Sequence, residues 1–199
     1  MASSFRTAVK KTASLDDHID HMRERVANGI QDPHVHRLAS NIAAGTWEWV
    51  TTRDGRGRVA CVPFKDRWHP VAPPGQMPPR CGAREDACVV ARIWDFTVLN
   101  VRYTSDPRGV DTYVDIGTTL AAGGGDCDDS TIFVCTLAES LGLESIARVI
   151  SQDGKFWAHV YPCIGLNGKW VALDTTEQGK RVGWEFPRPA AKRDFDMGL

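Results

Sequence analysis

The sequence of 199 residues predicts an α+β fold in which a buried helix packs on an antiparallel sheet. The first observation is an apolar run over residues 130–142, which has helical spacing and ends at a glycine. The second is that three β-rich runs follow it, separated by the turn sequences DGK and LNGK. The third is that two helix patterns lie near the start of the chain. A helix followed by an antiparallel meander is typical of the α+β class.

The start of the chain predicts a tail and then a helical lead-in. Residues 1–13 show no periodicity and are expected to form a flexible tail. Ser14 and Asp17 have the spacing of a capping box, and apolar residues recur at helical spacing until Gly29. A second short helix is predicted to start at Asp32, which can cap it, and to end at the next glycine. Together these two helices form a hairpin.

The next segment predicts a β-hairpin and a proline-rich loop. The runs TWEWVTT and RVACVPF are rich in β-formers, and Asp54–Gly55 between them is a turn signal. Proline is concentrated in residues 63–82, which are expected to form an extended loop without regular structure. We therefore assign residues 14–82 to an N-terminal unit and residues 83–199 to a core that starts with a buried helix.

Composition and charge exclude several classes of protein. The 24 basic and 25 acidic residues leave a formal charge of −1, and no segment gathers enough lysine and arginine to bind nucleic acid. No stretch reaches the roughly 18 apolar residues that a membrane-spanning helix needs. The N-terminus also lacks the apolar segment of a secretory signal. We therefore expect a soluble cytoplasmic protein without a nucleic-acid or membrane partner.

The sequence GGGDCDDS at residues 123–130 is the first candidate for chemistry. Its glycines allow a sharp turn and a close approach of the backbone, Asp126 can cap the next helix, and Cys127 falls in the first turn. Free amides at a helix start stabilise a thiolate, whereas Asp128 and Asp129 oppose its negative charge. Considered alone, this sequence also fits a purely structural role, in which Cys127 is a small residue at a helix start and Asp126 and Asp129 form a capping pair.

His159 and Asp174 supply the two further groups that a thiol nucleophile needs. If the sequence LNGK forms a two-residue turn, Tyr161 lies opposite Asp174. Because side chains alternate along a strand, His159 and Asp174 then share one face, within reach of a hydrogen bond. A three-residue loop would place them on opposite faces. A carboxylate on one imidazole nitrogen leaves the other to take a thiol proton, so Cys127, His159 and Asp174 form a nucleophile, base and orienting group.

At these residues the chain resembles the transglutaminase-like superfamily, whose core has a papain-type fold. The family pattern combines a cysteine that opens a helix in a GxCxD context, a strand of HxW/Y type and a strand of WxxxD type. The matching residues are GDCDD at 125–129, HVY at 159–161 and GKWVALD at 168–174. The resemblance implies a catalytic helix packed on an antiparallel sheet.

The resemblance also implies a cysteine enzyme that acts on an amide of a protein or peptide. Cys127 would be the nucleophile, His159 the acid and base, and Asp174 the orienting group, with a thioester as intermediate. Transfer to water, the outcome that we prefer, makes a peptidase or deamidase, and transfer to an amine makes a crosslinking enzyme. The Cys127 N–H and one further donor would bind the oxyanion. Neither a cofactor nor a metal is expected.

The short format, with a helical lead-in and a terminal GWEFP segment, resembles stand-alone members of this superfamily that are common in tailed phages and prophages. This narrower resemblance implies an alternative function. The protein would then be a phage virion or assembly protein that uses the fold to bind phage structural proteins. Its location would be the cytoplasm of a bacterial host or the virion.

Other chemistry-bearing residues fit known sites poorly. Cys61, His69, Cys81 and Cys88 have the ligand chemistry of zinc, but their spacings match no common zinc motif. The three glycines lack the lysine and hydroxyl residues of a P-loop. Most of the six cysteines are expected to be reduced, and Cys135, deep in the apolar helix, is expected to pack in the core.

Overall fold

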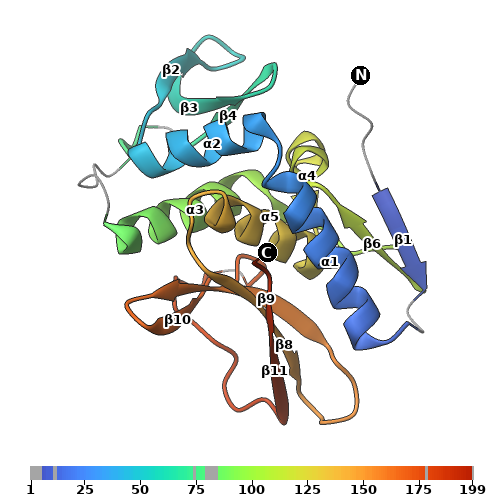
Figure 1. Ribbon diagram of the computed structural model, residues 1–199. Coiled ribbons are helices and arrows are strands. Elements are labelled where there is room, and N and C mark those ends of the chain that lie inside the picture. The colour runs from blue at the N-terminus through green and yellow to red at the C-terminus, as the bar shows by residue number, and fades with distance from the viewer. Residues whose placement is uncertain (1–5, 11–12, 74, 79–84, 178, 199) are drawn as a thin grey trace.

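The computed structural model describes residues 6–10, 13–73, 75–78, 85–177 and 179–198. Helix α5 (Cys127–Glu139) lies at the centre, with α2 (Pro33–Ala44) and α3 (Asp86–Asn100) on one side and a four-stranded antiparallel sheet on the other (Figure 1). Helices and antiparallel sheets in one chain confirm the predicted α+β class. Among the described residues, none of the helices combines the length and apolarity that crossing a bilayer requires.

Both predicted helices of the lead-in are present. Helix α1 (Leu15–Gly29) starts at Ser14, whose hydroxyl accepts the Asp17 N–H while the Asp17 carboxylate accepts the Ser14 N–H. This is the predicted capping box. Helix α2 starts at its cap Asp32 and ends at Gly45, which has a left-handed φ of 64°. Local signals of this kind are sufficient to predict where a helix starts, because the cap and the helix are adjacent in the chain.

Residues 6–10 correct the prediction of a flexible tail over residues 1–13. They form strand β1 (Arg6–Lys10), which pairs antiparallel with β6 (Val110–Val114). Residues 1–5 and 11–12 lie outside the described part of the chain. The strand was missed because its partner follows far later in the sequence, and pairing between distant segments leaves no local pattern.

The predicted β-hairpin is present, but the proline-rich loop is partly wrong. Strand β2 (Glu48–Thr51) pairs with β3 (Arg58–Phe64), as expected. Residues 67–70, inside the predicted loop over 63–82, form a third strand, β4 (Arg67–Pro70), on the other side of β3. Because β4 is an edge strand, its proline removes no bond that the sheet needs. The predicted boundary between residues 82 and 83 lies outside the described residues.

The four-stranded sheet contains the predicted meander and one further strand. Strands β8 (Ser145–Ser151), β9 (His159–Leu166) and β10 (Lys169–Ala172) follow one another as expected. Strand β11 (Ala191–Asp196) pairs with the free edge of β8, which makes the order β10–β9–β8–β11. It was not predicted because the sequence AKRDFD is mostly polar and only Phe195 is buried.

Short elements lead the chain into α5. They are α4 (Ile116–Ala122), β5 (Arg102–Tyr103) and β7 (Gly124–Gly125), and β5 pairs in parallel with β7. A Cβ on Gly124 would lie 2.7 Å from the Arg102 carbonyl oxygen. The close backbone approach expected of this glycine run is therefore present.

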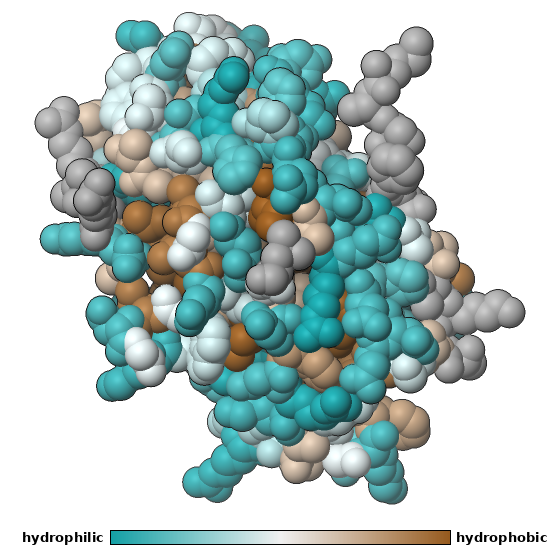
Figure 2. All heavy atoms as spheres, in the orientation of Figure 1, coloured by the Kyte–Doolittle hydropathy of each residue, from teal (hydrophilic) through white to brown (hydrophobic). Residues whose placement is uncertain are grey.

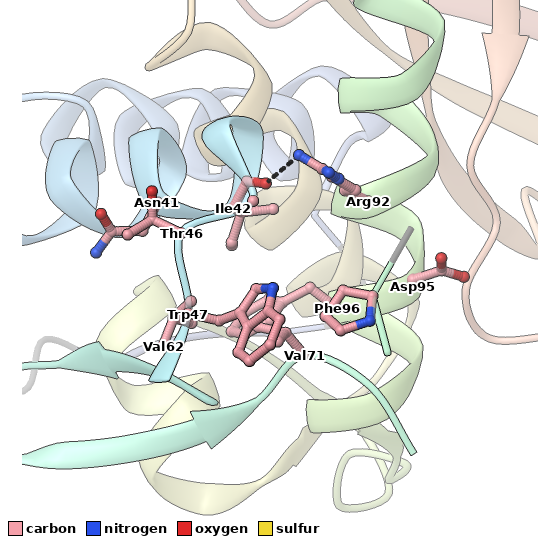
Figure 3. A pocket seen from close by; sticks show the side chains of 11 residues that line it. Asn41, Ile42, Thr46, Trp47, Val62, Val71, Arg92, Asp95 and Phe96 are labelled. Atoms are coloured by element: carbon pink, nitrogen blue, oxygen red, sulfur yellow. Dashed lines mark hydrogen bonds between the residues drawn. The ribbon is translucent and has the colours of Figure 1, made fainter. Parts of the chain in front are cut away.

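One hydrophobic cluster joins the N-terminal elements to the core. It draws buried side chains from α2, β3, α3 and α5, among them Leu38, Val62, Ile93 and Phe133. A cavity of about 30 Å³ remains between α2, β3 and α3, beside Trp47 and Phe96 (Figure 3). The face shown in Figure 2 is mostly hydrophilic, with apolar side chains gathered over α3. The lead-in and the core therefore pack as one body around α5.

Gly29 lies where α1 packs against α5, and this position has no room for a side chain. An added Cβ would lie 2.5 Å from Cγ2 of Thr136, which is fully buried and held by a hydrogen bond to the Ile132 carbonyl. Gly29→Ala should therefore lower the free energy of unfolding by about 1–2 kcal/mol, because overpacking outweighs the gain in helix propensity. Urea denaturation measures this, with Gly57→Ala as control, since that Cβ meets nothing closer than 3.8 Å. Equal losses in both variants would contradict the prediction.

Candidate active site

Cys127 is the first residue of α5 and is partly exposed. The Asp126 carboxylate accepts the N–H groups of Asp128 and Asp129, at 3.1 and 3.3 Å, and so caps the helix as predicted. The turn before it depends on glycine, because a Cβ on Gly125 would lie 2.6 Å from the Cβ of Asp129. The thiol is therefore placed at the positive end of the α5 dipole.

Asp129 does not form the predicted capping pair with Asp126. Its Oδ1 accepts the backbone N–H of Val114 at 3.1 Å, which ties β6 to the start of α5. A buried N–H group must find an acceptor, and this strand amide finds it in a distant side chain. The predicted helix cap by Asp126 is confirmed, whereas the predicted capping role of Asp129 is wrong.

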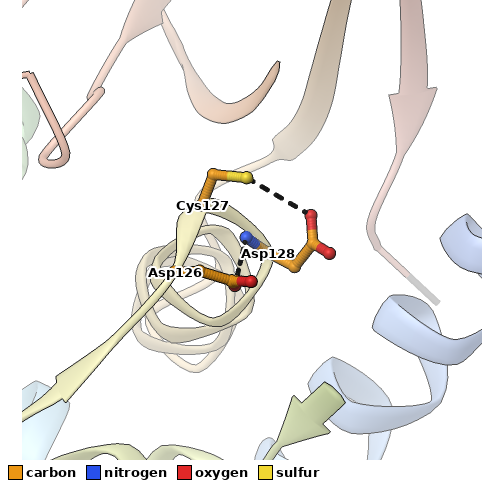
Figure 4. Close-up of side chains that lie close together, drawn as sticks. All are labelled: Asp126, Cys127 and Asp128. Carbon is orange, nitrogen blue, oxygen red and sulfur yellow. Dashed lines mark hydrogen bonds between the residues drawn. The ribbon is translucent and has the colours of Figure 1, made fainter. Parts of the chain in front are cut away.

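The surroundings of Cys127 raise the pKa of its thiol well above the usual value. Burial is the main cause, and repulsion by Asp128 and Asp126 adds to it. The thiol donates to Oδ1 of Asp128, at 3.7 Å (Figure 4), whereas a hydrogen bond from the Val160 N–H on β9 favours the thiolate. The helix start therefore does not activate the thiol by itself.

The three aspartates beside Cys127 all have a raised pKa. Burial, followed by the charges of neighbouring carboxylates, raises the pKa of Asp129 to about 7. Burial raises the pKa of Asp126 to about 6, and that of Asp128 lies well above its usual range. In the described part of the chain, Asp126, Cys127 and Asp128 alone bring three metal-ligand atoms together, within 4.8 Å. Backbone amides and the thiol already bond to these carboxylates, which explains their arrangement without an ion.

The predicted hydrogen bond between His159 and Asp174 is present. His159 Nε2 lies 2.8 Å from Oδ2 of Asp174. Strands β9 and β10 pair in the predicted register, and Asn167 and Gly168 form the turn with φ values of 51° and 73°. The side chain of Asp174 is 2% exposed and that of His159 15%. The pair is therefore shielded from most of the solvent.

Thr176 holds Asp174 in place and was missed from the sequence. Its N–H and its hydroxyl both donate to Oδ1 of Asp174, at 3.1 and 2.7 Å, which leaves Oδ2 for His159. Burial alone would raise the pKa of Asp174, but the bonds and charge of His159 and the bonds from Thr176 hold it below its usual range. The sequence DTT carries the signal, since a hydroxyl two residues after an aspartate commonly bonds to it.

The structure brings the Cys127 thiol to the strand that carries His159. The Val160 N–H, next to His159 on β9, donates to the sulfur. Among the described residues, however, no hydrogen bond joins Cys127 to His159, because the thiol donates to Asp128. His159 uses Nε2 for Asp174, so Nδ1 is the nitrogen left to exchange a proton.

The other cysteines play different parts. Cys61, Cys127, Cys135 and Cys163 are free thiols, which agrees with the expectation that most cysteines are reduced. Cys135 and Cys163 are fully buried in the core, and burial raises the pKa of Cys163 to about 12. Cys88 is disulfide-bonded and is therefore not a zinc ligand in this structure.

The fold and the site define an α+β protein with a thiol at a helix start and an imidazole–carboxylate pair on the adjoining sheet. The chain belongs to the transglutaminase-like superfamily, whose family model matches residues 76–175, about half of the 199 residues. The matched range includes Cys127, His159 and Asp174. It excludes α1, α2, β2–β4 and the segment after residue 175.

Curated proteins and solved structures do not narrow the assignment beyond this superfamily. Comparison with curated proteins gave no match. A solved structure of a candidate cysteine protease from Cytophaga hutchinsonii matches with 14% identity and a TM-score of 0.44, covering 86% of this chain and 49% of the other. The chain therefore spans about half the length of that protein.

Proposed function

We propose that the protein is a cysteine-dependent acyl-transfer enzyme that hydrolyses an amide bond of a protein or peptide. The observation that supports this most is the 2.8 Å hydrogen bond between His159 and Asp174. His159 belongs to β9, the strand whose Val160 N–H donates to the Cys127 sulfur. A nucleophile, a base and an orienting carboxylate then occupy the start of α5, the start of β9 and the segment that follows β10.

In the first half of the proposed reaction, the Cys127 sulfur attacks the amide carbon. The raised pKa keeps the thiol protonated at rest, so it must turn from Asp128 to His159 and give its proton to Nδ1 during the attack. Asp174 stabilises the imidazolium that forms. The carbon–nitrogen bond then breaks, and the amine or ammonia leaves with that proton. The acyl group remains on the sulfur as a thioester.

In the second half, a water molecule attacks the thioester and gives a proton to His159. The carbon–sulfur bond breaks, the proton returns to Cys127, and a carboxylic acid is released. One amide bond and one water thus yield an acid and an amine. The backbone N–H of Cys127 is suited to bind the oxyanion, because the Asp126 carboxylate accepts the N–H groups of Asp128 and Asp129 and not that of Cys127. An amine acceptor in place of water would give a crosslink.

Cys127 is expected to be the thiol that iodoacetamide modifies fastest at neutral pH. It is partly exposed and has a base within the same site, whereas Cys61 is only 6% exposed and Cys135 and Cys163 are fully buried. Peptide mapping by mass spectrometry gives the rate at each cysteine, with Cys61 as the internal control. A rate at Cys127 no greater than that at Cys61 would overturn the proposed function.

A further inference from the structure

The segment between β10 and β11 is anchored by one buried arginine. Arg148 on β8 is 5% exposed and donates to Oε1 of Glu185 at 2.8 Å. It also binds both carboxylate oxygens of Asp194 on β11, at 2.8 and 2.7 Å. A buried guanidinium is costly unless it is fully paired, and bidentate pairing tolerates little change in geometry. Asp194 therefore fixes the guanidinium on the sheet, and its Nη1 in turn holds the Glu185 carboxylate at one place.

The anchor brings an aromatic ring against His159. Phe186 follows Glu185 directly, and its ring centroid lies 5.0 Å from that of His159 at an interplanar angle of 65°. Trp184, on the other side of Glu185, packs on Phe186 with centroids 4.8 Å apart. Tyr161 lies 5.6 Å from His159 and pairs with Arg148 directly across β8 and β9. The anchor and the imidazole therefore share one face of the sheet.

We propose that Phe186 is a positioning residue for His159 and that the Arg148–Glu185 ion pair sets its place. The inference rests on the proposed function and extends it to the segment after residue 175, where the family match ends. The ring keeps water from the hydrogen bond between His159 and Asp174, and a hydrogen bond is stronger where water is excluded. It also stabilises the imidazolium that forms when the thiol gives up its proton.

The test uses Phe186→Leu, which removes the ring and keeps an apolar side chain. The rate of Cys127 alkylation by iodoacetamide at pH 7 should fall about 3- to 10-fold, the size expected of one aromatic contact. The pH of half-maximal rate should rise, because the thiolate–imidazolium pair is less stable and more of the thiolate must then form by loss of its proton to the solvent. Phe186→Tyr keeps the ring and should restore the wild-type profile.

Two further variants separate this role from general damage. Glu185→Gln weakens the anchor at a side chain that is 37% exposed and should shift the profile in the same direction by a smaller amount. Phe156→Leu is the matched control, since this ring is 73% exposed, and it should leave the profile unchanged.

The outcomes distinguish the two proposals. A folded Phe186→Leu variant with the wild-type pH profile overturns the role of Phe186, even if urea denaturation shows a loss of stability. If that variant does not fold, an unchanged profile in Glu185→Gln overturns the role of the anchor. Failure of the wild-type protein to alkylate selectively at Cys127 overturns the proposed function instead.

Discussion

The Cys127→Ala variant is expected to lose amide hydrolysis down to background, a fall by about 10⁴- to 10⁶-fold. The reaction proposed above runs through a thioester on the Cys127 sulfur, which alanine cannot form. Asp174→Asn in the same assay should lose about 10³- to 10⁴-fold, because a carboxamide does not stabilise the imidazolium. A peptide library scored for both ammonia release and cleavage measures the loss and shows which amide is attacked.

The controls for this prediction are a second thiol and a second carboxylate. Cys61→Ala removes a buried cysteine on β3, far from the start of α5 in the sequence, and should keep full activity. Asp153→Asn changes an aspartate whose carboxylate bonds only within its own loop. Activity that survives in Cys127→Ala would contradict the proposed enzyme and favour the alternative of an assembly protein.

The folded protein is expected to lose stability as the pH rises from about 4 to 8. The pKa of Asp126 is about 6 and that of Asp129 about 7 in the folded protein, whereas both are near 3.8 when unfolded. In this window the folded state binds more protons than the unfolded state, so the free energy of unfolding falls with pH. The stability is fully present below the unfolded pKa and is lost as pH rises through the folded values. One pKa unit corresponds to about 1.4 kcal/mol, so the two carboxyls together set an upper limit of about 7 kcal/mol on this loss.

Three other groups also change protonation with pH. Two of them do so below this pH window, and one acts against the trend within it. Asp174 and Asp194 have a lowered pKa, so their contribution is lost only at pH values below about 4. Burial lowers the pKa of His69, which opposes the trend over part of the window. Urea denaturation at pH 5 and pH 8 therefore measures a net slope, and a variant must isolate the contribution of the carboxyl groups.

Asp129→Asn isolates this contribution. Asparagine keeps an oxygen for the Val114 N–H but does not titrate, so the difference in stability between pH 5 and pH 8 should shrink. Asp153→Asn is the matched control, because hydrogen bonds from the Lys155 and Phe156 amides lower the pKa of that exposed carboxyl, so it does not titrate between pH 5 and pH 8. An unchanged slope in Asp129→Asn, with the same slope in the control, would show that the carboxyls at the start of α5 do not carry the effect.

Several elements follow from local signals in the sequence. The Ser14–Asp17 capping box, the Asp32 cap and the turn at Asn167 and Gly168 each involve groups that are close in the chain. That turn sets the register of β9 and β10, and side chains alternate between the two faces of each strand. The hydrogen bond between His159 and Asp174 is therefore predictable from the sequence.

Other elements depend on partners that are distant in the chain. Strand β1 needs β6, and strand β11 needs the edge of β8, and neither strand has a strong apolar pattern of its own. Strand β4 lies in a proline-rich segment because an edge strand tolerates proline. Phe186 is held beside His159 through the ion pairs of Arg148, and the Asp129 carboxylate bonds to a strand amide rather than to its own helix.

The fold class, the helix that carries Cys127 and the pairing of His159 with Asp174 all follow from the order of residues along the chain. Caps, turns and strand alternation act between neighbours, so a linear sequence is enough to predict them. The state of the thiol and the surroundings of the imidazole depend instead on three-dimensional packing. Burial, the charge of Asp128 and the ring of Phe186 act through space, and their strength depends on how closely distant segments approach.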